Sequence, residues 1–230
     1  FQGASPRCWA LDVIVIVDMS GSMRINDPDN YRFDAVEEVI YELASNKQEE
    51  CLDANHRVGL VTFSSEAISH INLKSITIRT EDNTTDWINN VFGDAVSEAK
   101  YVTAADTNFA AAFETAKTMF DRAPKLTEPS DYGERRQLVV FITDGKPTYA
   151  LDGSQKPTET LMCDWIGDLQ QDSWKGKAIW ILPLYANDNY LDEEGCNKTI
   201  RQNFEEIAIA SGGKLAEFTY NNQTIPSFVF

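Results

Sequence analysis

The chain has 230 residues, 43% of them hydrophobic, which is enough for one large α/β domain or two small ones. Its 36 acidic residues outnumber its 20 basic ones, and the net charge of −16 would repel a phosphate backbone, which argues against nucleic-acid partners. Apolar runs stay well short of the roughly 20 residues that a membrane-spanning helix needs, so we expect no membrane insertion by this segment.

The first predicted strand covers residues 12–17, where Val13–Val17 is apolar and β-branched at every position. Such a run is typical of a strand buried on both faces of a sheet. We expect Asp27 and Asp29 to lie in a solvated turn after this strand. Apolar residues then recur at helical spacing and predict a helix over residues 31–45.

Two further strands are predicted at residues 56–63 and 67–73, and their short link favours a hairpin. Helices are predicted over residues 87–92, 94–102, 108–123, 158–172 and 198–210. Strands are predicted over residues 137–143, 178–184 and 215–220. Because strands alternate with helices, the sequence predicts an α/β fold with a doubly wound, mainly parallel six-stranded sheet. One antiparallel edge strand and helices on both faces complete the predicted architecture.

Oxygen-bearing side chains follow the first predicted strand directly, at Asp18, Ser20 and Ser22. In open α/β sheets, ligands bind just outside the carboxyl ends of the strands. One carboxylate and two hydroxyls are hard donors that suit a divalent cation such as Mg²⁺. Taken alone, however, Asp18 is more often a helix cap or part of an ordinary turn.

The pattern Asp18-x-Ser20-x-Ser22 resembles the first segment of the metal-ion-dependent adhesion site of von Willebrand factor type A domains. Thr107-Asn108-Phe109-Ala110 looks like the threonine segment of that site, which opens a helix. The stretch from Val139 to Gly145 looks like the third segment, in which an aspartate, here Asp144, ends a buried strand. The three segments occur in the family's order, and the resemblance covers nearly the whole chain.

The resemblance implies a Rossmann-like fold and a cation, Mg²⁺ or else Mn²⁺ or Ca²⁺, at a single site. Its ligands would be Asp18, Ser20, Ser22, Thr107 and Asp144. In the family, the position that remains open on the metal is taken by a carboxylate of the partner. We expect the loops at residues 26–30, 104–106, 146–155 and 187–195 to set ligand specificity.

The resemblance also guides the domain organisation. Residues 1–3 look like the end of a protease-cleavable tag, and we expect residues 4–230 to form one domain. The family has a final helix after its last strand, whereas only residues 224–230 remain here, so we expect that helix to be truncated. Met23-Arg24-Ile25-Asn26 follows Ser22 in place of the acidic residues that some relatives use for a neighbouring calcium ion, so we expect no second site there.

Four cysteines and three glycosylation sequons favour an extracellular protein. The sequons begin at Asn83, Asn197 and Asn222. The cysteines allow three pairings. Among these we favour Cys8 with Cys51, and Cys163 with Cys196.

These features predict a secreted or cell-surface adhesion module that binds a protein ligand presenting an Asp or Glu carboxylate. Extracellular matrix and cell-surface receptors are the candidate ligands. The alternative is an intracellular scaffold subunit of a multiprotein complex, since the family also occurs in such complexes. An enzyme is disfavoured because His56 and His70 are the two histidines and fall on or beside predicted strands, and because the chain has no Gly-x-Ser-x-Gly motif. Ser20 also stands where a phosphatase with an aspartate nucleophile needs a second aspartate.

Overall fold

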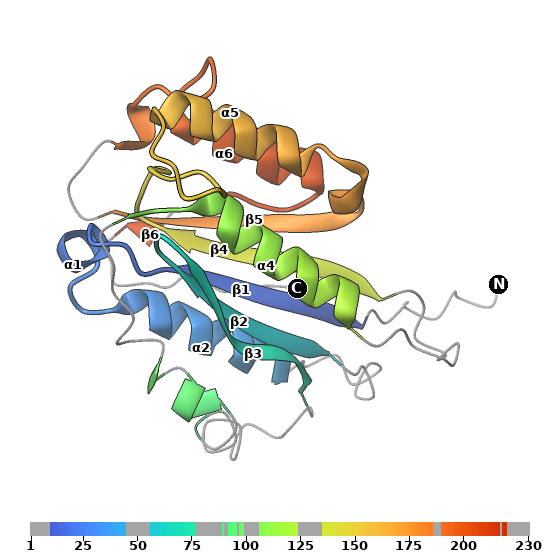
Figure 1. Cartoon of the computed structure of the whole chain (residues 1–230). Coiled ribbons are helices and arrows are strands. Elements are labelled where there is room, and N and C mark those ends of the chain that lie inside the picture. Colours follow the sequence, from blue (N-terminus) through green and yellow to red (C-terminus); the bar gives the residue numbers. More distant parts are fainter. Residues whose placement is uncertain are drawn as a thin grey trace.

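A six-stranded sheet with the order β3-β2-β1-β4-β5-β6 forms the centre of the structure (Figure 1). The computed structural model describes residues 10–44, 56–76, 89, 92–95, 97–98, 106–123, 135–185, 190–216 and 218–219. The strands are β1 (Leu11–Asp18), β2 (Arg57–Phe63), β3 (Ala67–Ser75), β4 (Arg136–Thr143), β5 (Lys177–Tyr185) and β6 (Phe218–Thr219). The helices are α1 (Met23–Asn26), α2 (Tyr31–Ala44), α4 (Phe109–Arg122), α5 (Thr158–Leu169) and α6 (Ile200–Ser211), with 3₁₀ turns η2 (Asp172–Trp174) and η3 (Tyr190–Asp192).

The pairing of the strands confirms the predicted fold class. β1 runs parallel to β2 and β4, and the parallel order continues through β5 to β6. β3 returns from β2 by a hairpin and is the antiparallel edge strand. The carboxyl ends of β1 and β4 therefore lie side by side at one edge of the sheet.

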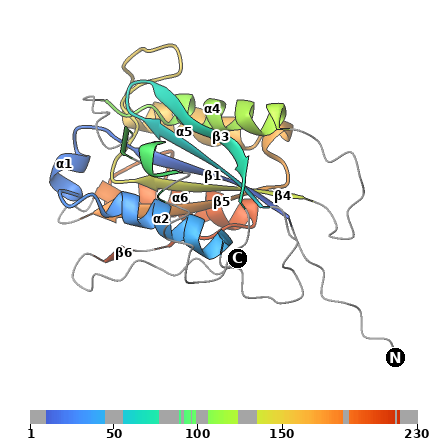
Figure 2. The same cartoon turned by 90° about the horizontal axis from the view of Figure 1, so that it is seen from below.

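Two layers of helices cover the sheet because successive strand residues point to opposite faces. Val13, Val15 and Val17 of β1 pack with α2 on one face, and Ile14 and Ile16 pack with α4, α5 and α6 on the other. Figure 2 shows α2 on one side of the sheet and α4 with α5 on the opposite side. All five β1 residues are fully buried, as the unbroken apolar run predicts.

An aromatic cluster joins the sheet to α4 and α5. The ring centroids of Phe109 and Phe141 are 4.9 Å apart, and that of Trp165 lies 5.2 Å from both Phe109 and Phe113. Edge-to-face contacts of this kind add to the free energy of burial. The cluster fixes the first turn of α4, which begins two residues after Thr107.

Several helix ends differ from the predicted ones. α1 lies in a stretch where no helix was predicted, and α5 ends at Leu169 rather than at residue 172. α6 begins at Ile200 because Thr199 caps it, in a capping box with Gln202. Gly212 closes α6 with a φ of 78°, in the left-handed conformation that glycine adopts readily at the end of a helix.

Some predictions fall outside the described residues. These concern residues 1–3, Cys8, Cys51, Asn83, Asn222, the segment 224–230 and most of the two helices expected over residues 87–102. Within that last stretch, residues 92–95 and 97–98 are helical. Among the described residues, no helix has the length and apolar character needed to cross a membrane.

Candidate metal centre

Asp18 ends β1 and is held in place by two hydrogen bonds. Its Oδ1 accepts from the backbone N–H of Ser20 at 2.8 Å, and its Oδ2 accepts from the Thr143 hydroxyl at 2.6 Å. The first bond closes a turn, which is the ordinary role expected of Asp18 when it is considered alone. The second comes from the last residue of β4, the neighbouring strand, so it joins two segments of the predicted site.

Ser22 links the first segment to the third. The Ser20 and Ser22 hydroxyl oxygens are 3.0 Å apart, and the Ser22 hydroxyl donates to Asp144 Oδ1 at 2.9 Å. A hydroxyl that gives its proton to a carboxylate keeps its lone pairs available for a cation. The predicted ligands of both segments thus lie within one hydrogen-bonded group.

Thr107 closes the group from the second segment. A Cβ placed on Gly145 would lie 3.6 Å from Asp18 Oδ2 and 3.7 Å from Thr107 Oγ1. Both oxygens therefore lie close to Gly145. Asn108, not Thr107, caps α4 by accepting from the Ala111 N–H at 3.0 Å. Among the described residues, the hydrogen bonds of Thr107 are made by its backbone and not by its hydroxyl.

Hydrogen bonds of the Thr107 backbone set the position of its hydroxyl. Its N–H donates to the Thr148 hydroxyl at 2.9 Å, and its carbonyl accepts from the Thr148 N–H at 2.8 Å. The Asn108 amide donates to the Ala150 carbonyl at 2.8 Å. The loop after β4 is therefore tied to the loop before α4.

The two carboxylates of the site are buried together. Asp18 is 0% exposed and Asp144 is 1% exposed. Burial raises the pKa of Asp18 above its usual range, and burial together with the nearby Asp18 charge raises the pKa of Asp144 to about 7. The nearest cationic influence on Asp18 is Arg32, whose guanidinium is bonded to Asp27 at 2.7 Å.

The donor set fits a hard divalent cation. It combines two buried carboxylates with three hydroxyls, all oxygen donors of the kind that Mg²⁺ and Ca²⁺ prefer. Among the described residues there is no cluster of three or more His, Cys, Asp or Glu side chains that could hold a metal, and the candidate site itself has two carboxylates. A cation between Asp18 and Asp144 would also relieve the repulsion that raises the pKa of Asp144.

A family model described as von Willebrand factor type A domain matches residues 13–146. The chain belongs to the von Willebrand factor type A domain family. The matched residues include the whole of the candidate site, from Asp18 to Asp144. No curated protein matches the chain.

Several solved structures share this fold. The conserved hypothetical protein BatB from Bacteroides thetaiotaomicron is 15% identical with a TM-score of 0.51, and the match covers 91% of each chain. A von Willebrand factor type A protein from Catenulispora acidiphila is 17% identical with a TM-score of 0.51, over 92% of this chain and 39% of that one.

A third similar structure carries a metal at the corresponding motif. It is proximal thread matrix protein 1 from the mussel byssus with a zinc-occupied metal-ion-dependent adhesion site, 15% identical with a TM-score of 0.53. The match covers 96% of this chain and 44% of the mussel chain. At these identities the likeness shows the fold alone.

Two residues of this von Willebrand factor type A domain hydrogen-bond the carboxylates of the site but were not predicted from the sequence to do so. Asn26 donates its amide N–H to Asp144 Oδ2 at 3.0 Å, and Thr143 bonds Asp18. Asn26 lies four residues after Ser22, which is the spacing of one helical turn, and this was the available signal. Thr143 carried no signal beyond its place at the end of a predicted strand.

The prediction that Asp27 lies in a solvated turn is wrong. Its side chain is 2% exposed because its carboxylate accepts from the backbone N–H groups of Tyr31 and Arg32, at 2.7 and 3.1 Å. It also pairs with the Arg32 guanidinium. Asp27 therefore fixes the start of α2, and Asp29 remains exposed as predicted.

The domain contains one of the two predicted disulfides within its described residues. Cys163 of α5 is bonded to Cys196 in the loop before α6, which confirms the predicted pairing. The Asn197 side chain of the neighbouring sequon is exposed. Its glycosylation stays a prediction.

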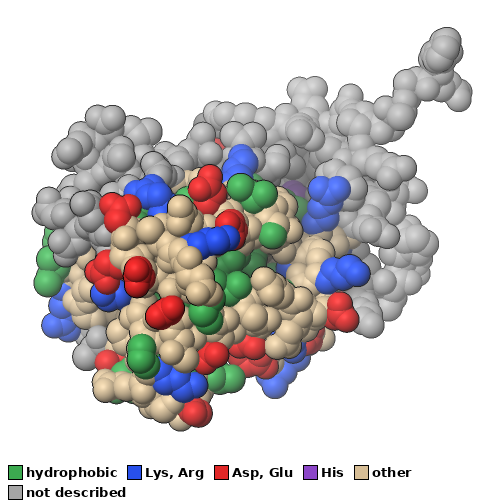
Figure 3. Space-filling view, turned by 90° about the horizontal axis from the view of Figure 1, so that it is seen from above, with side chains coloured by type: hydrophobic (Ala, Val, Ile, Leu, Met, Phe, Trp, Pro, Cys, Tyr) green, Lys and Arg blue, Asp and Glu red, His purple; other side chains and the backbone are tan. Residues whose placement is uncertain are grey.

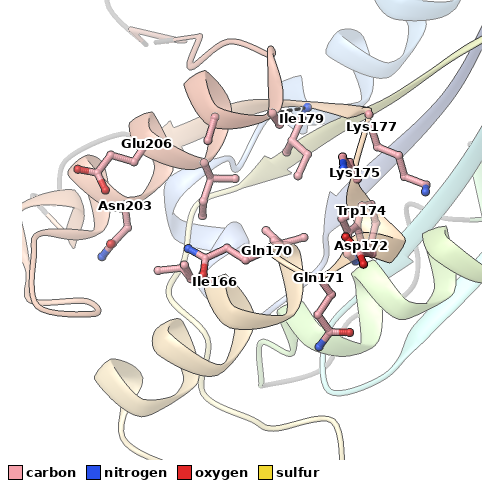
Figure 4. A pocket seen from close by; sticks show the side chains of 15 residues that line it. Ile166, Gln170, Gln171, Asp172, Trp174, Lys175, Lys177, Ile179, Asn203 and Glu206 are labelled. Carbon is pink, nitrogen blue, oxygen red and sulfur yellow. Dashed lines mark hydrogen bonds between the residues drawn. The ribbon is translucent and has the colours of Figure 1, made fainter.

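We call the edge of the sheet where β1 and β4 end the metal edge. A cavity of about 500 Å³ lies away from it, between α5, η2, the start of β5 and α6 (Figure 4). Trp174 and Ile179 line it together with Gln170 and Lys177, and Asn203 stands at another side. Figure 3, which looks onto the α5 and α6 side, shows apolar side chains among charges of both signs. This mixture does not select one ligand, and the cavity contains none of the predicted site residues.

Proposed function

We propose that this domain is an extracellular, metal-dependent protein-binding module that binds a carboxylate of its partner. The observation that carries the proposal is the Ser22 hydrogen bond to Asp144, which gathers two buried carboxylates and neighbouring hydroxyls at the edge where strands β1 and β4 end. Membership of a family of protein-binding domains supports it.

Asp18, Ser20, Ser22, Thr107 and Asp144 are the residues that would hold Mg²⁺. A bound cation would supply a positive charge with room for one more oxygen. Three of the five side chains are neutral hydroxyls, so they compensate little of that charge. An anionic oxygen of the partner is the ligand that such a site attracts most strongly.

The disulfide between Cys163 and Cys196 supports an extracellular location rather than the intracellular scaffold. Disulfides form and persist in oxidising compartments and are rare in the cytosol. The exposed sequon at Asn197 points in the same direction.

The positions of the histidines favour binding over catalysis. His70 lies on the edge strand β3, where its Nε2 is 2.7 Å from the Thr62 hydroxyl. His56 lies at the start of β2, and its Nδ1 accepts from the Leu11 N–H at 3.1 Å. Since β2 runs parallel to β1, its start is the end opposite to the carboxyl end of β1, so His56 is not placed to serve as a base for Ser20 or Ser22.

Peptide selection tests the proposal directly. Displayed random heptapeptides would be bound to the immobilised domain in Mg²⁺ and eluted with EDTA. We expect the eluted peptides to be enriched in Asp and Glu, and we expect Thr107→Ala to lose them. The matched control is Thr115→Ala, which removes a hydroxyl from α4 that bonds only within its helix, to the Ala111 carbonyl at 2.9 Å.

Two outcomes would contradict the proposal. Peptides that resist elution by EDTA would show that binding does not depend on a metal. EDTA-eluted peptides without acidic residues would show that the metal does not take a carboxylate from the partner.

A further inference from the structure

A second concave surface adjoins the metal edge. It is a groove of about 440 Å³ between the start of α4, the loop after β4 and one face of α5. Pro147, Tyr149 and Ala150 form one wall, and Leu161 with Trp165 forms part of the opposite wall. We call this surface the acidic groove because Asp152, Asp164 and Asp168 also line it.

Hydrogen bonds connect the acidic groove to the metal ligands. Phe109 and Ala110 of the groove follow Thr107 by two and three residues. The Tyr149 N–H donates to the Thr107 carbonyl at 3.2 Å, and the Asn108 amide holds the Ala150 carbonyl. Since the start of α4 and the wall formed by Tyr149 and Ala150 adjoin Thr107, a peptide that reaches the metal has the groove within reach of its neighbouring residues.

The acidic groove is apolar along one part and negative along another. Leu151, which is 58% exposed, is its most accessible apolar side chain. The carboxylates of Asp152, Asp164 and Asp168 face one ammonium group, that of Lys156. Asp164 and Asp168 are four residues apart on α5 and so lie on the same face of the helix.

These negative charges are poorly balanced. Lys156 pairs with Asp164 at 3.4 Å, and both side chains are largely exposed, so the pair is weak. Asp168 accepts from the neutral Gln171 amide at 3.0 Å, and Asp152 accepts from the Ser154 hydroxyl at 2.6 Å. The hydrogen bonds of Asp168 and Asp152 are thus made to neutral groups, and Lys156 is the cation that acts on Asp152.

The wall of the acidic groove also holds a polar group without a partner. Trp165 is 2% exposed, and among the described residues its indole N–H has no hydrogen-bond acceptor. An unpaired buried donor costs free energy.

We infer that the acidic groove binds a Lys or Arg side chain of the same partner segment that offers its carboxylate to the metal. Such a side chain matches the groove because its methylene stem can pack on Leu151 and Tyr149 while its charged end reaches the aspartates. The inference rests on the proposed function and extends it from one acidic residue to a pair of opposite charges.

The charge of the whole chain favours the same pair. With a net charge of −16, the domain repels a purely acidic segment before the metal is reached. A cationic residue beside the carboxylate removes that repulsion and gains attraction from the aspartates. The added attraction should weaken as salt screens it.

The experiment uses displayed heptapeptides with a fixed central Asp, bound in Mg²⁺ and eluted with EDTA. We expect Lys or Arg at a preferred spacing from the Asp. A selected peptide is then synthesised with Arg and with citrulline, which has nearly the same shape without the charge. We expect the Arg peptide to bind about two- to fivefold more tightly, the effect of one well-placed exposed charge pair.

Two double variants locate the effect. In Asp164→Asn with Asp168→Asn, the two synthetic peptides should bind equally. The control is Glu159→Gln with Asp172→Asn, which removes two exposed charges at or near α5 that do not line the groove. In the control the preference for Arg should persist.

The outcomes separate this inference from the proposed function. EDTA-eluted peptides without a preferred cationic position, or equal binding of the two synthetic peptides to the wild type, would overturn the inference alone. A preference for Arg that survives in the Asp164 and Asp168 variant would place the cation elsewhere and overturn it too. If EDTA elutes no peptide, the proposed metal-dependent binding is contradicted, and the inference fails with it.

Discussion

The Ser22 hydroxyl donates a hydrogen bond of 2.9 Å to Asp144 Oδ1, across 122 positions of the sequence. This contact joins the loop after β1 to the loop after β4. It orients the Asp144 carboxylate toward Ser20 and Asp18 and leaves the hydroxyl oxygen of Ser22 free to bind a cation. The following predictions test whether this arrangement is a metal site.

Gly145→Ala should abolish metal binding while leaving the fold intact. The new methyl group would meet Asp18 Oδ2 and Thr107 Oγ1 at ordinary contact distances of 3.6 and 3.7 Å, so it fits without strain. It would, however, occupy space beside the oxygens that a cation needs. In EDTA the melting temperature should match the wild type, and the increase on adding Mg²⁺ should disappear. Gly167→Ala on α5, which has open space around it, should keep that increase.

Asn26→Ala should weaken Mg²⁺ binding by about tenfold, a typical effect of losing a group that orients a metal ligand. Asn26 holds Asp144 Oδ2 at 3.0 Å, and without it the carboxylate can rotate. Calorimetric titration would measure the change. Asn72→Ala, an exposed amide on β3, serves as the control. Equal affinities in all three proteins would show that Asn26 does not position Asp144.

Asp144→Asn should have opposite effects with and without metal. In EDTA at pH 8 it should stabilise the domain, because it removes one of two buried like charges. In Mg²⁺ it should be less stable than the wild type, because the wild type gains binding free energy that the variant lacks. Urea unfolding in both buffers would measure the two free energies. If the variant were less stable than the wild type in both buffers, the two carboxylates would not repel one another in the metal-free domain.

Stability should fall at acidic pH through His56. Burial, mainly, lowers the pKa of His56 from 6.5 to about 4, so the unfolded chain binds a proton between these values while the folded domain does not. The His56 contribution is therefore complete above pH 6.5 and is lost as the pH falls toward 4. Between pH 7 and pH 5 the loss should be about 2 kcal/mol. Because the raised pKa of Asp144 acts in the opposite direction in both proteins, the His56 contribution is the difference between the urea unfolding profiles of the wild type and His56→Asn in EDTA. We expect that difference to change by this amount between pH 7 and pH 5, and parallel pH profiles would contradict it.

Removing the disulfide should destabilise the domain without changing the metal site. The Cys163–Cys196 bond closes a loop of 33 residues, for which chain entropy predicts about 4 kcal/mol as an upper value. The double variant Cys163→Ser with Cys196→Ser should unfold at lower urea concentration and titrate Mg²⁺ with the wild-type affinity. A large loss of Mg²⁺ affinity would show that α5 and the loop before α6 support the metal edge more directly than the contacts indicate.

The strands and the three segments of the site could be predicted because their signals are local. Val13–Val17 is apolar throughout and is buried on both faces. The oxygen-bearing residues Asp18 and Asp144 directly follow or end such runs, and parallel strands bring their carboxyl ends to one edge. Thr107 was placed by the resemblance of Thr107-Asn108-Phe109-Ala110 to the family's threonine segment, which opens a helix.

Other features depend on contacts that the sequence does not display. Asn26 acts on Asp144 only because α1 turns it back toward β4, and Asp27 is buried because it caps α2. The acidic groove is a further example, since Asp152 comes from a loop and Asp164 from a helix. The end of α5 at Leu169 reflects η2 and the packing of Trp174, which override a weak local preference for a longer helix.

The most direct test of the account is a calorimetric titration of Mg²⁺ into the wild type, Asp18→Ala and Asp121→Ala. Asp121 is an exposed carboxylate on α4 that pairs with Lys117, so its loss controls for the change of charge. We predict one saturable site in the wild type and in Asp121→Ala, and none in Asp18→Ala. Absence of binding in the wild type, or equal binding in Asp18→Ala, would contradict the claim that these oxygens form a metal site.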